Sequence, residues 1–193
     1  MSQEEAKDQY KRWCDKESSI PIFSQPWWLD CVAGEDNWNI CLVEKGGRIV
    51  ASMPYIVTSR FGFKLCVMPR LTQILGPYIK YPQGQKYYKR LSWEKKIMTE
   101  LIANLPKVDY FSQNFDRSIS NWLPFYWKGF VQTTRYSYVI ENTTLKELES
   151  NFDTDIRRRR KKAEKLGVSI YESDDVRKFY ELYVKTHNRQ NII

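Results

Sequence analysis

The sequence predicts a mixed α/β (α+β) fold, in which an antiparallel meander of strands is flanked by helices. Two observations carry this prediction. Three runs rich in β-forming residues follow one another between Trp38 and Met68, separated only by short glycine-containing turns. Apolar residues at helical spacing lie before and after these runs. At 193 residues, the chain is long enough to bury a core without a disulfide or metal staple.

Two short helices are expected before the meander. Residues 4–16 are polar apart from a few apolar side chains at helical spacing, namely Ala6, Tyr10 and Trp13. Residues 25–33 follow a candidate N-cap, Ser24, and Pro26 is tolerated in the first turn of a helix. Gly34 supplies the end of this second helix.

The three strands of the meander are expected at residues 38–44, 48–58 and 64–68. Two adjacent glycines, Gly46 and Gly47, join the first two strands, because they adopt the backbone angles of a tight hairpin turn. Residues 61–63, Phe-Gly-Phe, mark the second reversal. Short turns between consecutive strands predict antiparallel pairing.

An irregular crossover is expected after the meander. Residues 69–87 contain isolated prolines and glycines, with a short extended piece at 73–75. The helix that follows ends before Pro106, and residues 108–111 then form a further strand. The apolar face of that helix repeats at four-residue intervals, at Trp93, Ile97, Leu101 and Leu105.

A short helix at residues 118–127 and a long strand at 130–140 are expected next, because polar and apolar residues alternate in the second segment. Thr144 with Glu147 predicts a capping box at the start of another helix. Residues 168–171 are predicted as a strand, and Ser173 as the cap of a final amphipathic helix. The apolar positions of that helix are Val176, Phe179, Tyr180, Tyr183 and Val184.

The charge of the chain has one sharp concentration. The formal net charge is +8, and a helix capped by Asp153 and ended by Gly167 carries six consecutive basic residues. These are candidate phosphate- or nucleic-acid-binding residues, because arginine forks match phosphate oxygens; a solvated basic face is the alternative. The six are Arg157, Arg158, Arg159, Arg160, Lys161 and Lys162, of which Arg159 falls on the stripe of Ile156 and Ala163.

Several classes of site and location are excluded or disfavoured. The four cysteines lie far apart without a C-x-x-C pair, which favours buried small hydrophobes over a zinc or redox site. The N-terminal residues lack the apolar region of a secretory signal, and no apolar run is long enough to cross a bilayer. We therefore expect no transmembrane segment and a cytoplasmic location.

The sequence identifies no catalytic residue. His187 is the only histidine, which excludes a Ser-His-Asp triad or a multi-histidine metal site, so we expect no metal and a surface role for His187. Asp109, Asp116 and Glu141 border predicted strands and are either bases or cap and turn residues. Four tryptophans either fill the core or form a stacking platform for bases: Trp27, Trp28, Trp122 and Trp127.

Five phrases in a fixed order carry a resemblance to a known family. They are PIFSQPWWLDCVAG (21–34), GGRIVASMPY (46–55), LGPYI (75–79), NWLPFYWKGFVQTTRYSYVIE (121–141) and IRRRRKKAEKLGVSIYES (156–173). Together they resemble the Fem-type, or FemAB-like, acyltransferases of the GNAT superfamily, over nearly the whole chain from Pro21 onward. The resemblance implies a GNAT-like mixed sheet, two such units in one protein, and transfer of an acyl or aminoacyl group to an amine.

The resemblance also implies donors, acceptors and a division of the chain. The donor would be acyl-CoA or aminoacyl-tRNA, used as a substrate with no covalently bound cofactor, and the acceptor a peptidoglycan precursor of the cell wall. We expect residues 1–143 to form the first GNAT-like unit and 144–193 to open a second, truncated one. The crossover at 69–87 lacks the Gln-x-x-Gly-x-Gly/Ala turn that binds a donor pyrophosphate, so the first unit is not expected to bind CoA in the usual way.

Two functions of different kinds stay open at this point. The first is the acyltransferase, acting by positioning an amine against a thioester or ester. The second is a non-enzymatic nucleic-acid (tRNA)-binding module that uses the basic run at 157–162. A third possibility is docking on an anionic membrane surface through the basic helix and exposed aromatic residues.

Overall fold

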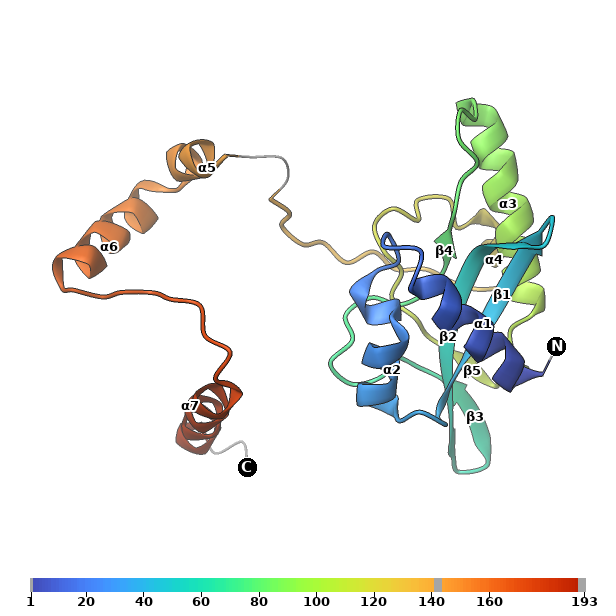
Figure 1. Cartoon of the computed structure of the whole chain (residues 1–193), viewed down its shortest axis with the longest axis horizontal. Helices are drawn as coiled ribbons and strands as arrows, with labels where there is room; N and C mark the ends of the chain where they lie inside the picture. Colours follow the sequence, from blue (N-terminus) through green and yellow to red (C-terminus); the bar gives the residue numbers. More distant parts are fainter. Residues whose placement is uncertain (1, 141–143, 191–193) are drawn as a thin grey trace. The chain divides into compact units, whose positions relative to one another are not determined.

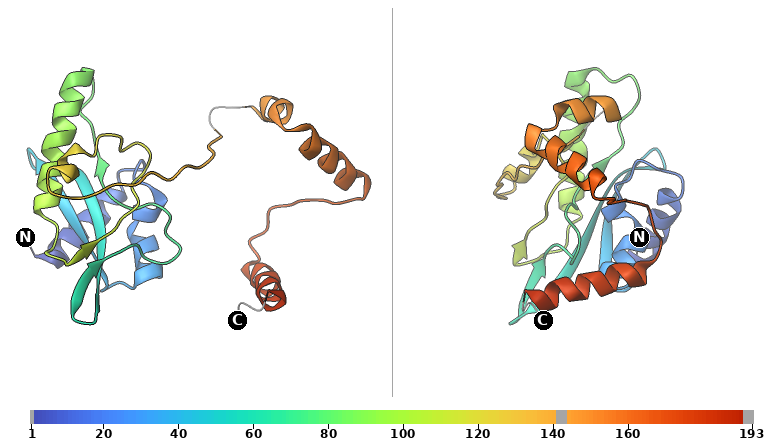
Figure 2. Two further views of the ribbon diagram at one scale, coloured as in Figure 1. Left: turned by 180° about the vertical axis from the view of Figure 1, so that it is seen from behind. Right: turned by 90° about the vertical axis from the view of Figure 1, so that its left-hand side faces the viewer.

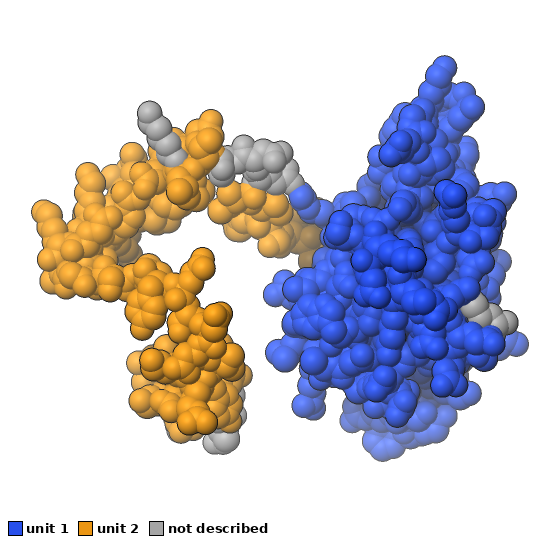
Figure 3. All heavy atoms as spheres, in the orientation of Figure 1, with its two compact units in different colours: residues 1–133 blue, residues 134–193 orange. Residues whose placement is uncertain are grey.

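The computed structural model describes residues 2–140 and 144–190 (Figure 1). The chain divides into two compact units, Met1–Thr133 and Thr134–Ile193, which are coloured separately in Figure 3. The boundary predicted at residue 143 falls on a residue outside the described ones.

Unit 1 is built on a mixed sheet. The sheet contains β1 (Trp38–Lys45), β2 (Arg48–Arg60), β3 (Phe63–Cys66), β4 (Tyr78–Ile79) and β5 (Tyr110–Phe111). The strand order is β1-β2-β3-β5, with β4 paired to β2. Consecutive strands β1, β2 and β3 are antiparallel, which confirms the predicted meander, whereas β5 runs parallel to β3. The mixed α/β fold with a mixed sheet flanked by helices is thereby confirmed.

Helices cover both faces of this sheet (Figure 2). The helices α1 (Gln3–Cys14) and α2 (Pro26–Ala33), between which lies the 3₁₀ turn η1 (Ile22–Ser24), contribute to one core cluster together with Trp38, Ile40 and Leu42 of β1. The helices α3 (Tyr87–Ala103) and α4 (Leu123–Tyr126) contribute to the other, with Cys41 and Val43. Side chains alternate between the faces of a strand, so β1 serves both cores.

One helix start differs from the prediction. The N-cap of α2 is Gln25, without a side-chain cap hydrogen bond, and Ser24 belongs to η1 instead. The carbonyl oxygen of buried Ser24 accepts a hydrogen bond of 2.7 Å from the hydroxyl of Tyr10. A tertiary contact to α1 therefore decides how the chain enters α2, which local cap preferences alone do not reveal.

The predicted strand at residues 130–140 is wrong. Phe130 packs against Phe111 and Phe125 at the edge of the core, but residues 131–140 form no strand. Val131 and Tyr138 are almost fully exposed. Alternating β-formers stabilise a strand only where another strand pairs with it, and these residues have none. The short extended piece also differs, since β4 occupies Tyr78–Ile79 rather than 73–75.

Unit 2 contains three helices in its described part, α5 (Leu145–Asn151), α6 (Thr154–Lys165) and α7 (Val176–Arg189). The capping box of Thr144 and Glu147 is confirmed, as is the cap of α6 by Asp153. Asp175, not Ser173, caps α7, and the predicted strand at 168–171 is wrong. Residues 134–140 and 144–190 include none whose side chain is described as buried, so these helices are held by local interactions.

A glycine in the crossover is required by a close contact. Gly76 has a φ of 119°, which L side chains rarely adopt, and a Cβ added there would lie 2.4 Å from Cδ1 of Phe115. Replacing Gly76 by Ala is expected to lower the free energy of unfolding by about 3 kcal/mol, from backbone strain and overpacking. Urea denaturation measures the change.

Gly84 provides the matched control for this substitution. It also has a positive φ, 69°, but no atom lies within 4 Å of an added Cβ. The Gly84→Ala variant is therefore expected to lose only about 1 kcal/mol, the backbone cost alone. Equal losses for the two variants would contradict the role assigned to the Phe115 ring.

The four cysteines are free thiols, and they differ in access. Cys14, Cys41 and Cys66 are buried, as predicted, whereas Cys31 is exposed. Burial raises the pKa of the three buried thiols to about 11, 12 and 11 respectively. Since the thiolate is the reactive form, a thiol reagent at pH 8 is expected to modify one residue rapidly in the folded protein. The Cys31→Ser variant should show no rapid phase, and a second rapid thiol would contradict the described burial.

Candidate functional site

The basic helix α6 forms through local signals. The side chain of Asp153 accepts a hydrogen bond of 2.8 Å from the backbone N–H of Asp155, which caps the first turn. Asp155 lies in that turn and Lys162 and Lys165 in the last one, so both charge signs complement the helix dipole. No residue of α6 is buried. The helix therefore presents its charges to solvent.

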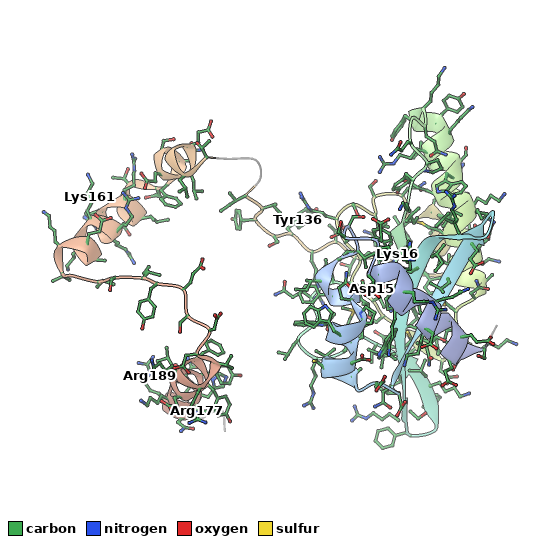
Figure 4. All side chains as sticks on the ribbon, viewed as in Figure 1. Asp15, Lys16, Tyr136, Lys161, Arg177 and Arg189 are labelled. Carbon is green, nitrogen blue, oxygen red and sulfur yellow. The ribbon has the colours of Figure 1, made fainter. Side chains whose placement is uncertain are left out.

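Five basic side chains lie along one face of α6 and line a shallow surface hollow with Thr154. They recur at intervals of three and four residues, which places them on adjacent turns of one side. We call this set the cationic strip. Figure 4 labels Lys161, one of its members. The strip consists of Arg157, Arg158, Lys161, Lys162 and Lys165.

Three arginines of the run are engaged with acidic side chains. Arg158 lies 2.7 Å from Oδ1 of Asp155, and Arg159 lies 2.6 Å from Oδ2 of the same residue. Arg160 contacts Glu149 at 2.5 Å and Glu164 at 3.3 Å. Such exposed pairs contribute only about 0.3–0.5 kcal/mol each, so a stronger anion can displace the acidic partners.

The remaining members of the strip carry charges that are not paired. Among the residues whose side chains are described, Arg157, Lys161, Lys162 and Lys165 form no ion pair; Arg157 only reaches Oγ1 of Thr154 at 3.4 Å. Lys161 lies four residues from both Arg157 and Lys165, a spacing at which like charges repel. A row of close phosphates would relieve this repulsion and match the strip.

The structure thus sorts the six sequence-predicted residues into two groups. Four of them share the strip, and Arg159 and Arg160 lie outside it. Lys165, which sequence reasoning missed, joins the strip because it follows Lys161 by four positions. The stripe on which Arg159 falls is itself exposed, since Ile156 is half exposed and no residue of α6 is buried.

The ends of the parallel strands in unit 1 are a second place to look for a site, because ligands of α/β sheets bind beside the carboxyl ends of such strands. Here the crossover segment bonds to Asn114, which follows β5. The backbone N–H of Leu75 donates to the carbonyl oxygen of Asn114 at 2.7 Å, and Nδ2 of Asn114 donates to the carbonyl oxygen of Gln73 at 3.1 Å. Sδ of Met68 also accepts from the N–H of Asn114.

Among the described residues of unit 1, Glu94 on α3 carries the one buried carboxylate. It accepts a hydrogen bond of 2.7 Å from the hydroxyl of Tyr81 and one of 3.4 Å from Nδ2 of Asn121. The guanidinium of Arg90 lies 3.5 Å away and over the Tyr81 ring. Burial, followed by this hydrogen bond to Glu94, raises the pKa of Tyr81 to about 12. The partners satisfy the carboxylate, which gives the cluster a structural role.

The other sequence candidates have structural or surface positions. Oδ2 of Asp109 accepts from the N–H of Lys64 on β3, so Asp109 links the start of β5 to that strand. Oδ1 of Asp116 accepts from the N–H of Ser118 two positions on, so Asp116 acts as a turn residue. Glu141 lies outside the described residues. His187 packs on Tyr183 of the same helix.

The four tryptophans do not share one environment. Trp28 and Trp122 are half-buried, whereas Trp27 and Trp127 are more than half exposed, so the core interpretation is wrong for the latter two. Across residues 2–140 and 144–190, no three His, Cys, Asp or Glu side chains gather as a metal site would require. Over the same residues, no helix combines the length and the apolar character needed to cross a bilayer.

Comparisons with known proteins give only distant likenesses. No family model and no curated protein matches the chain. One similar solved structure is a ribosomal-protein-alanine N-acetyltransferase from Brucella melitensis, at 9% identity and a TM-score of 0.38, covering 74% of this chain and 95% of that one. Another is an aminoglycoside acetyltransferase from an uncultured soil metagenomic sample, in complex with sisomicin, at 12% identity and a TM-score of 0.33, covering 70% and 86%. At these values the likeness carries no conclusion about what this chain does.

The cationic strip generates a prediction for nucleic-acid binding. Replacing Arg157, Arg158, Lys161 and Lys162 by Ala, the strip variant, is expected to weaken tRNA binding about a hundredfold at low salt. The slope of log K against log salt should fall by roughly 3, because each phosphate contact contributes about 0.7 to 0.9. Fluorescence anisotropy with labelled tRNA over a salt series measures both.

A charge-matched control separates the strip from net charge. Replacing Lys86, Lys89, Lys96 and Lys128 by Ala removes four positive charges from exposed positions of unit 1. This variant should retain nearly the wild-type affinity and salt slope. If both variants lose affinity equally, tRNA responds to the overall charge of the chain and the strip has no specific role.

Proposed function

We propose that the chain acts as an acyltransferase of GNAT, Fem-like type, which transfers an aminoacyl group from tRNA to an amine of a peptidoglycan precursor. The ordered sequence resemblance supports the family. The mixed sheet, with its antiparallel meander and a parallel strand added through a helix, supports the same assignment, because this is the arrangement that the resemblance predicts.

The cationic strip is the observation that favours tRNA over CoA as the donor. Four of its cations, Arg157, Lys161, Lys162 and Lys165, are unpaired with any described side chain and lie on a helix that has no buried residue. A polyanion offers successive phosphates to such a row, whereas CoA offers few. The crossover of unit 1 also lacks the glycine-rich turn expected for a CoA pyrophosphate, and its Leu75 bonds to Asn114, which follows β5.

The proposed reaction is an ester-to-amide transfer. The acceptor amine attacks the carbonyl carbon of the aminoacyl ester, an amide bond forms, the ester bond breaks, and the ribose hydroxyl leaves with the proton that the amine gives up. Catalysis by positioning and by backbone donors to the developing oxyanion suits this chemistry. In this proposal the strip binds the tRNA and takes no part in the bond changes.

A nucleic-acid-binding module without catalysis is the second candidate. The same strip favours it, because phosphate contacts alone give salt-dependent binding. Only the first candidate predicts chemistry at the ester.

The two candidates are separated by following the ester. The protein is incubated with tRNA carrying a radiolabelled amino acid and with a lysine-containing peptidoglycan precursor. We expect label to pass from the base-labile ester to a base-stable amide, and the strip variant to slow this transfer at subsaturating tRNA by about a hundredfold, in line with its weaker binding. The charge-matched variant from unit 1 should transfer at the wild-type rate.

Binding of tRNA without transfer of the label would reject the enzymatic candidate. If the chain binds tRNA with the expected salt slope but the label stays on the ester at every acceptor concentration, the transferase proposal is rejected. The non-enzymatic module is then the function that remains.

A further inference from the structure

The hairpin of β2 and β3 ends in exposed aromatic side chains. Ser59 pairs with Lys64, Arg60 pairs with Phe63, and residues 61–62 form the two-residue turn. Phe61 is 86% exposed and Phe63 is 58% exposed. The hairpin extends beyond the rest of unit 1 at its lower end in Figure 1. We call residues 60–64 the hairpin tip.

The residues of this turn do not suit its backbone conformation. Phe61 has a φ of 52° and Gly62 a φ of 83°, so both central residues are left-handed, as in a type I′ turn. Asparagine, aspartate or glycine is preferred at the first of these positions, and a bulky residue there is strained. Burial does not offset the strain, because most of the Phe61 side chain faces solvent. Strain at a side chain that the core does not hold indicates a role outside the fold.

Cations accompany the aromatic rings. Arg60 and Lys64 flank the turn, and Cζ of Arg60 lies 5.2 Å from the centroid of the Phe61 ring. Asp109 is the neighbouring acid, and its carboxylate is engaged with the backbone N–H of Lys64. The sequence around the tip has the same sign, since residues 45–93 contain nine Lys or Arg and no Asp or Glu.

We propose that the hairpin tip docks on an anionic lipid surface. The rings of Phe61 and Phe63 enter the boundary between headgroups and acyl chains, and Arg60 and Lys64 contact the headgroup phosphates. In such a membrane the apolar acyl chains lie directly beneath negatively charged headgroups. This arrangement matches a tip whose aromatic rings are flanked by cations. A projecting tip inserts into a soft surface, whereas base stacking requires an open aromatic platform.

The test compares binding to vesicles with a variant that keeps the hairpin. Phe61→Asn with Phe63→Thr, the tip variant, places the favoured Asn-Gly pair in the turn and a β-former in the strand, so the fold is retained or stabilised. The wild-type chain is expected to co-sediment with vesicles of phosphatidylcholine and phosphatidylserine more strongly than with phosphatidylcholine alone. The tip variant should lose at least about tenfold in partitioning, because two apolar rings no longer enter the boundary.

Two further variants complete the design. Phe61→Trp with Phe63→Trp should restore or strengthen binding, because tryptophan suits the interface. Tyr87→Gln with Tyr88→Gln removes two other exposed aromatic residues, at the start of α3, and should leave binding unchanged. Circular dichroism and thermal unfolding verify that each variant is folded.

Each alternative to membrane docking by the tip predicts a different experimental result. No binding to phosphatidylserine vesicles, or equal binding of the tip variant and the wild-type chain, overturns the proposal. Loss of vesicle binding in the strip variant alone assigns the membrane contact to α6 and also overturns it. A tip variant that loses tRNA binding while vesicle binding is unchanged would make the tip a nucleic-acid contact instead. None of these readouts depends on transfer activity, so the proposal stands or falls separately from the acyltransferase.

Discussion

Unit 1 depends on covering both faces of the β1–β2 ladder. Trp38, Ile40 and Leu42 belong to the core shared with α1 and α2, whereas Cys41 and Val43 belong to the core shared with α3. A ladder with apolar residues on both faces must be covered on both, because neither face can stay in water at low cost. This requirement fixes helices before and after the meander. It also sets the place of β5, which α3 carries back to pair in parallel with β3.

The part of the fold that follows from local patterns could be predicted from the sequence. The meander, the cap of α6 and the capping box of Thr144 each depend on residues close together in the chain. The strands expected at 130–140 and 168–171 failed because β-propensity does not supply a partner strand. The start of α2 was misjudged because Tyr10, far away in the sequence, bonds to the Ser24 carbonyl.

Only the basic composition of the candidate site could be predicted from the sequence, not the set of residues that share one face. Six consecutive basic residues are visible in the sequence, but a consecutive run winds around a helix and cannot act as one surface. The acidic partners decide which charges are available. Asp155, Glu149 and Glu164 form ion pairs with three arginines of the run, Arg158, Arg159 and Arg160. Lys165 lies outside the consecutive run and belongs to the strip only because helical spacing places it one turn beyond Lys161.

The cationic strip and the hairpin tip differ in their aromatic content, and they therefore suit different kinds of anionic partner. The strip on α6 has no aromatic residue within Thr154–Lys165, so it offers charge and hydrogen bonds but no aromatic ring to enter a bilayer. It therefore suits a row of phosphates, through contacts that salt weakens strongly. The hairpin tip has only two cations but carries two exposed rings beside them. Its contact would gain free energy mainly from apolar burial and would survive salt that releases the strip. Salt thus distinguishes the two surfaces within one chain, because Coulomb attraction is screened whereas the hydrophobic effect is not.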